Sequence, residues 1–165
     1  MTPENAEELK DALDQVPYSL FFKVWYNLQK SLGPEEKKSV LTKVGRAIGK
    51  EIRTEGVEDE EALLKRLREF LESEWGLSGE VEVELVRDND GNATHLRTHL
   101  QKCAMCPANT YFKKRDGGQP ACMFPPVVMA ALSKFRKKFG LKNLAFEEVK
   151  KPGPVGECEM LFRIR

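Results

Sequence analysis

The sequence lacks the features that would place the protein in a membrane or on a nucleic acid. No apolar run approaches the ~18–20 residues that a membrane-spanning helix needs. The charges almost cancel, with 27 Lys and Arg against 26 Asp and Glu, so nothing in the balance favours nucleic acid or an anionic membrane surface as a partner. The chain begins MTPE, which is acidic and lacks the charged and apolar regions of a signal peptide. We therefore expect a cytoplasmic protein.

The sequence also lacks the usual motifs of catalysis. It contains no nucleophile triad, no phosphate-binding loop and no dinucleotide fingerprint. Its two histidines, His95 and His99, alternate with Arg97 along one predicted strand face, so we interpret them as solvent-exposed. The many carboxylates mark the wet faces of helices and strands, and no pair of them stands out as an acid–base couple. These absences favour a binding or sensing domain over an enzyme.

The first 76 residues show the apolar spacing of helices. Apolar side chains recur every three or four residues and predict helices over residues 3–16, 18–32, 35–54 and 59–75. The first two predicted helices carry apolar groups, including Phe21, Phe22 and Trp25, on more faces than one core contact needs. We therefore interpret residues 1–34 as a helical extension that supports a homodimer, and residues 35–165 as the main domain.

After Gly76 the apolar period changes from that of a helix to that of a strand. Residues 80–85 alternate Glu with Val or Leu, and a second strand over residues 93–101 follows the turn sequence DNDG. A short helix from residue 107, a loop over 113–120, a helix over 125–139 and two strands over 142–150 and 157–165 complete the chain. This order contains no parallel βαβ unit. It predicts the α+β class, with N-terminal helices packed on a four-stranded antiparallel sheet and a long helix between its two hairpins.

Two glycines lie one helical turn apart in the predicted helix over residues 35–54. Glycine costs a helix ~1 kcal/mol relative to alanine, so Gly45 and Gly49 suggest that another element approaches the backbone closely. We favour a helix–helix crossing over a ligand contact. In the ligand hypothesis, an apolar pocket lies between the sheet and the helices that carry Gly45, Gly49 and Met129. An ordinary filled core explains the same residues.

All four cysteines lie in the last third of the chain, at Cys103, Cys106, Cys122 and Cys158. Cys103 and Cys106 form a CxxC step that can chelate one ion from a tight turn. Cys122 precedes a helix, whose N-terminus is expected to lower its pKa, and Cys158 shares a strand face with apolar residues. Because disulfides are uncommon in the cytoplasm, we expect the four thiolates to hold zinc tetrahedrally.

Other interpretations of the cysteines stay open. His99 and Glu147 are reserve donors that could replace a cysteine ligand. An iron–sulfur cluster also uses four thiolates and is not excluded by ligand type. Redox-active thiols and inert buried cysteines are the two alternatives to a metal site.

From about Val44 to its end, the chain resembles the 4-vinyl reductase-like domain, also called the archaeal hydrocarbon-binding protein family. The resemblance depends on the order and spacing of several short pieces. They are GRAIG at residues 45–49, Trp75-Gly76, the hairpin around Gly91, PACMF at residues 120–124, Glu147, GEC at residues 156–158 and FRI at residues 162–164. The resemblance covers roughly three-quarters of the chain.

This resemblance implies an α+β fold like that of vesicle-tethering complex subunits, and an often dimeric domain that binds small molecules. It implies a zinc site at Cys122, Glu147 and Cys158, although Lys150 stands where related sensors have a further cysteine; Cys103 and Cys106 could compensate. We therefore expect a zinc-containing sensor domain for an apolar ligand, without catalysis of its own. The alternatives are an enzyme or accessory protein for a tetrapyrrole or other vinyl-bearing substrate, and a thiol redox sensor.

Overall fold

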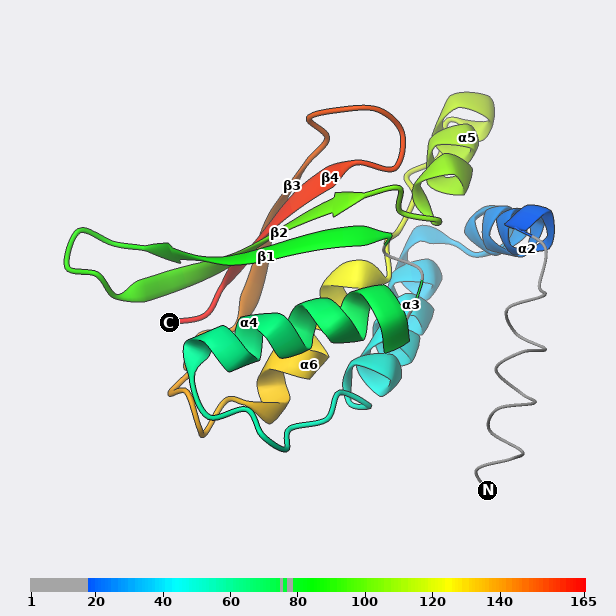
Figure 1. Ribbon diagram of the computed structural model, residues 1–165. Helices are drawn as coiled ribbons and strands as arrows, with labels where there is room; N and C mark the ends of the chain where they lie inside the picture. Colours follow the sequence, from blue (N-terminus) through cyan, green and yellow to red (C-terminus); the bar gives the residue numbers. More distant parts are fainter. Residues whose placement is uncertain (1–17, 75, 77–78) are drawn as a thin grey trace, which may run out of the picture.

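The computed structural model describes residues 18–74, 76 and 79–165 (Figure 1). The N-terminal part contains α2 (Tyr18–Ser31), α3 (Pro34–Gly49), α4 (Glu60–Glu69) and the π-helix η1 (Phe70–Glu74). The remainder contains β1 (Glu80–Arg87), β2 (Ala93–Gln101), α5 (Cys106–Asp116), α6 (Phe124–Lys134), β3 (Ala145–Lys150) and β4 (Cys158–Arg163). The helix predicted over residues 3–16 lies outside the described residues.

The four strands form one antiparallel sheet in the order β1-β2-β4-β3. The predicted α+β class, with two hairpins in one antiparallel sheet, is therefore confirmed. The hairpins meet along β2 and β4, where Leu100 pairs with Cys158. In Figure 1, α3, α4 and α6 lie below the sheet, whereas α5 and α2 lie beyond its right-hand end. The first residues of β4 and the last residues of β2 thus lie at the end of the sheet from which α5 departs.

The two faces of the sheet differ in polarity because its strands alternate. On β2, Leu96, Thr98 and Leu100 are buried, whereas the intervening residues are only half-buried. The same alternation on β4 buries Cys158, Met160 and Phe162. Directly paired residues share a face, so Cys158 belongs to the apolar face with Leu100. The alternation along β4 therefore places the Cys158 side chain in the protein interior.

Gly45 and Gly49 mark a close crossing of α3 and α6. A Cβ atom at Gly49 would lie 2.2 Å from the Val127 carbonyl oxygen, and one at Gly45 would lie 2.9 Å from Pro126 Cγ. The favoured interpretation, a helix–helix crossing, therefore explains both glycines. The predicted alternative of a ligand beside them does not fit, because α6 itself fills that space. Met129, the third expected ligand contact, is half-buried and packs against the core.

Several element boundaries differ from those predicted. Helix α3 ends at Gly49 rather than near residue 54, and Lys134 Nζ donates to the carbonyls of Lys50 and Ile52 just beyond its end. Helix α5 runs through the predicted loop as far as Asp116, since the residue that ends it is Gly117, in the left-handed conformation at φ 66°. Helix α6 ends at Lys134, before the predicted end at residue 139. The end of α3 thus lies at a contact with a distant lysine, whereas that of α5 follows from a local glycine.

Candidate metal centre

Three separate segments bring the four cysteines together. Cys103 follows β2 and Cys106 begins α5; the turn between them is closed by Cys106 N–H donating to the Cys103 carbonyl at 3.3 Å. Cys122 lies two residues before α6, and Cys158 is the first residue of β4. The Cys103 N–H donates to the Gly156 carbonyl at 3.0 Å, which ties the CxxC turn to the segment that enters β4. Backbone contacts therefore hold the CxxC turn beside the segment that carries Cys158.

Cys106 lies at the centre of the sulfur contacts. The thiols of Cys103 and Cys158 hydrogen-bond to its sulfur, and Cys122 is close enough to interact with it electrostatically. Lys151 Nζ also donates to Cys106 Sγ, at 3.3 Å. Cys103, Cys106 and Cys158 are buried, and none of the four cysteines forms a disulfide. We call these four cysteines and Lys151 the thiol cluster.

The contacts within the thiol cluster separate the pKa values of its members. Hydrogen bonds from Cys103 and Cys158, together with the Lys151 ammonium, lower the pKa of Cys106 far below that of a free thiol. The hydrogen bond to Cys106 and burial raise the pKa of Cys103 and the pKa of Cys158. Burial opposes the charge on Lys151, but the nearby cysteine sulfurs raise its pKa overall. The cluster therefore favours one negative sulfur, at Cys106, paired with one ammonium.

The expected lowering of the Cys122 pKa at a helix N-terminus is wrong. The Phe124 N–H does act in that direction, but burial around the sulfur is the larger effect and raises the pKa of Cys122 to about 11. Cys122 as a residue still keeps part of its surface in contact with solvent. Its thiol is thus a protonated group under neutral conditions unless a metal or another cation approaches it.

Helix α2 fixes the segment that carries Cys122. Gln29 is fully buried, and its side-chain amide both donates to the Ala121 carbonyl at 2.7 Å and accepts from the Ala121 N–H at 3.0 Å. Trp25 Nε1 donates to Asn109 on α5 at 2.7 Å. The described part of the predicted N-terminal extension therefore packs against the main domain and positions the segment that carries Cys122.

The two reserve donors lie elsewhere on the sheet. His99 Nε2 is 2.9 Å from Glu157 Oε1 and faces away from Leu100 and Cys158. Glu147 lies 3.2 Å from His95 Nε2 and 3.4 Å from Arg163 Nε, at the far end of β4 from Cys158. The structure therefore brings the four cysteines together but places His99 and Glu147 elsewhere. Glu147 is the residue that the resemblance implied as a ligand.

The four cysteines lie in neighbouring segments, but their sulfur atoms do not form a metal-coordination geometry. Among the residues that the structure describes, no three His, Cys, Asp or Glu side chains are already arranged to hold a metal ion. Hydrogen bonds instead link Cys103 and Cys158 to Cys106. The donor set still fits zinc, because four cysteine sulfurs are a common structural zinc site, and binding would replace thiol protons by the ion.

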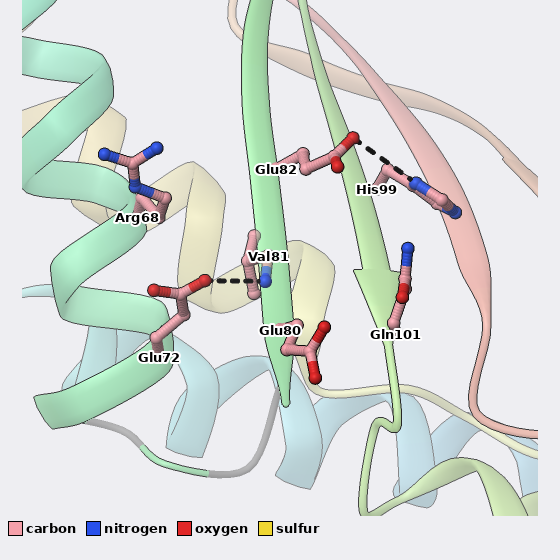
Figure 2. Close-up of a pocket in the computed structure, with 7 residues that line it drawn as sticks. All are labelled: Arg68, Glu72, Glu80, Val81, Glu82, His99 and Gln101. Atoms are coloured by element: carbon pink, nitrogen blue, oxygen red, sulfur yellow. Dashed lines mark hydrogen bonds and ion pairs between the residues drawn. The ribbon is translucent and has the colours of Figure 1, made fainter.

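A groove lies between β1 and the α4–η1 segment, and no cysteine lines it (Figure 2). Its volume is about 370 Å³, and it is lined by Arg68, Glu72, Glu80, Val81, Glu82, His99 and Gln101. Glu72 accepts the Val81 N–H at 2.8 Å, so its carboxylate already secures the start of β1. The lining is mostly charged. The groove therefore does not match the apolar ligand that the sequence predicts.

Comparison of the sequence with models of known protein families and with curated proteins finds no match. The resemblance to the 4-vinyl reductase-like domain thus stays a prediction. Within the described ranges, no helix has both the length and the apolar character needed to cross a membrane.

Sequence reasoning found the cysteines but missed the residues that support them. Lys151 contacts Cys106, which is 45 residues away in the sequence. Gln29 binds Ala121, the neighbour of Cys122, across 92 residues. Neither residue belongs to a motif. The one available signal is local: Lys151 directly follows β3 and precedes the proline- and glycine-rich connection to the strand that carries Cys158.

Proposed function

We propose that this protein is a cytoplasmic metal-binding module in which Cys103, Cys106, Cys122 and Cys158 bind one zinc ion. The observation that supports the proposal is the convergence of four cysteines from three chain segments around Cys106. Inert packing does not account for this arrangement, since isolated buried cysteines have no need to contact one another or a lysine ammonium. Four sulfur donors are the ligand set that structural zinc prefers.

Zinc would link the end of β2, the start of α6 and the start of β4. Because the unfolded chain has no such site, the binding free energy would add to the stability of the fold. The resemblance extends the proposal to a sensor domain, without catalysis of its own, that binds an apolar small molecule. The thiol cluster would then be the structural centre of that sensor.

Elemental analysis of protein purified without added metal tests this proposal. We expect about one zinc per chain, and we expect Cys158→Ser to lose the metal together with thermal stability. His95→Ala should retain both, because His95 lies on the opposite face of the sheet. Iron and acid-labile sulfide in place of zinc would indicate an iron–sulfur cluster instead. Protein that contains no metal and does not bind added zinc would contradict the proposal.

A second candidate, a thiol redox sensor, is favoured by one contact in particular. The Cys106 sulfur lies against two other thiols and an ammonium, a setting that stabilises a thiolate. Peptide mass spectrometry of the same purified protein separates the two functions. A metal-free chain with Cys106 in a disulfide to Cys103 or Cys158 would favour the redox sensor over the zinc module.

A further inference from the structure

Lys151 is the cation of the thiol cluster. It lies at the start of the connection between β3 and β4, which contains no cysteine. The residue directly follows β3 and has an exposed side, yet its ammonium reaches the buried Cys106 sulfur at 3.3 Å. At the other end of the same connection, the Gly156 carbonyl accepts the Cys103 N–H at 3.0 Å. Both ends of the β3–β4 connection therefore contact the CxxC turn.

The neighbouring lysine shows that this placement is specific. Lys150 Nζ lies 3.0 Å from Glu148 Oε1, and its side chain is 60% exposed. Among the described contacts, Lys151 has no carboxylate partner, and a cysteine sulfur takes that place. Two adjacent lysines thus have different roles, since one pairs with a surface glutamate and the other with the thiol cluster.

The net charge of a zinc-bound site explains how a lysine beside the cysteines would stabilise it. Four thiolates and one Zn²⁺ carry a net charge of about −2, and burying uncompensated charge is costly. An ammonium that donates to one of the sulfurs reduces that charge and fixes the orientation of the ligand. Groups that hydrogen-bond to metal ligands in this way typically contribute 10–100-fold to metal affinity.

We propose that Lys151 is a positioning residue of the metal site. Its ammonium donates to the Cys106 sulfur, offsets the negative charge of the zinc–thiolate centre, and holds the β3–β4 connection against the CxxC turn. This inference depends on the proposed zinc function, and it adds a specific determinant of zinc affinity that lies outside the four ligands.

The test compares zinc affinity in the wild type, Lys151→Met, Lys151→Arg and Lys150→Met by competition with a chromogenic chelator. We expect Lys151→Met to bind zinc 10–100-fold more weakly, because it keeps most of the side-chain volume but loses the charge. Lys151→Arg should restore most of the affinity. Lys150→Met, which removes the adjacent charge, should stay within about threefold of the wild type.

Two further measurements separate positioning from a general effect on folding. The Co²⁺-substituted Lys151→Met protein should keep the d–d absorption bands of tetrahedral sulfur coordination that the wild type shows, because all four sulfur ligands remain. The metal-free Lys151→Met protein should still unfold in one cooperative urea transition, as metal-free Lys150→Met does. A metal-free Lys151→Met protein that is already unfolded without urea, while metal-free Lys150→Met is folded, would show a merely structural role and overturn the inference.

The outcomes distinguish this inference from the proposed function. If the wild type binds zinc and Lys151→Met binds it as tightly as Lys150→Met does, the role of Lys151 is refuted while the zinc module stands. If the wild type binds no zinc, the proposed function fails and the inference fails with it. Weaker binding in Lys151→Met, with rescue by arginine and an unchanged cobalt spectrum, supports both.

Discussion

His99 lies between two carboxylates on the polar face of the sheet. Its Nε2 is 2.9 Å from Glu157 and its Nδ1 is 3.6 Å from Glu82. The hydrogen bond to Glu157 is the main cause that raises the pKa of His99, with a further contribution from Glu82. The folded state therefore binds the His99 proton more tightly than the unfolded chain does, which links stability to pH.

The stabilisation from His99 should be present in acid and lost in base. It is complete below the ordinary histidine pKa of about 6.5 and disappears as pH rises through the higher folded-state pKa. We expect His99→Gln to lower the free energy of unfolding at pH 5.5 by up to about 1 kcal/mol, and to have little effect at pH 8.5. Urea denaturation at the two pH values measures this difference.

The partner of His99 provides the control. In a Glu157→Gln background, His99→Gln should cost less at pH 5.5, because the main hydrogen bond that favours the imidazolium is already gone. An equal effect of His99→Gln at pH 5.5 and 8.5 in the wild-type background would contradict this account.

At the residue scale, strand alternation predicted which side chains share a face of the sheet. The sequence did not predict the contacts between residues that only the tertiary fold brings together. The shared polar face of His95 and His99 and the buried position of Cys158 follow from a period of two, although the structure leaves both histidines half-buried rather than exposed as predicted. The contacts of Gln29 with Ala121 and of Lys151 with Cys106 depend on where distant helices and connections lie. No local pattern encodes such placements.

At the element scale, the α3–α6 crossing depends on the absence of side chains at two positions. A Cβ atom at Gly49 would be 2.2 Å from a backbone carbonyl oxygen of α6 and 2.7 Å from Ala130 Cβ. Backbone atoms cannot rotate away as a flexible side chain can. The two helices would therefore have to separate to accept even one methyl group.

We expect Gly49→Ala to lower the free energy of unfolding by about 1–3 kcal/mol, despite the better helix propensity of alanine. Gly33→Ala is the matched control, because a Cβ there meets nothing within 4 Å and the residue has an ordinary φ of −61°. Its effect should stay within about 0.5 kcal/mol. Thermal and urea denaturation measure both variants. Equal stability of Gly49→Ala and the wild type would show that the helices are not in close contact.

The existence of the elements was easier to predict than their ends. Apolar periods of 3.6 and 2 identified α2, α3, α4, α6 and all four strands. The π-helix η1 was not predicted, since the sequence FLESE continues an ordinary helical pattern. It brings the Glu72 carboxylate to the Val81 N–H, a contact between two elements that no pattern within either one contains.

At the scale of the whole molecule, α2 has two different faces. One face enters the fold, where Trp25 is buried and bonded to Asn109 while Phe22 and Tyr26 contact Tyr111. The predicted dimer contacts Phe22 and Trp25 are therefore engaged within the chain, and Phe21 stacks on Trp25. The sequence showed that α2 has apolar residues on more than one face, but periodicity alone could not say which face packs inside.

The other face of α2 leaves Leu20 and Val24 exposed, at 50% and 58%. These side chains lie one helical turn apart, so they share one side of α2. Together with the further apolar residues that the sequence places on the same helix, this pair is the surface of α2 that is left available for a contact between two chains. We propose that it contributes to the homodimer that the sequence predicts.

Light scattering coupled to gel filtration at micromolar concentration tests this association. We expect the wild type to be a dimer and Val24→Glu to weaken it at least tenfold, because the substitution places one carboxylate per chain in an apolar contact. Val149→Glu is the matched control, since Val149 is 47% exposed on β3, an edge strand that the proposed contact does not include. Its dimer should be unchanged. A monomeric wild type, or a dimer disrupted by Val149→Glu and not by Val24→Glu, would refute the assignment of this face, because the two substitutions introduce the same charge at similarly exposed valines.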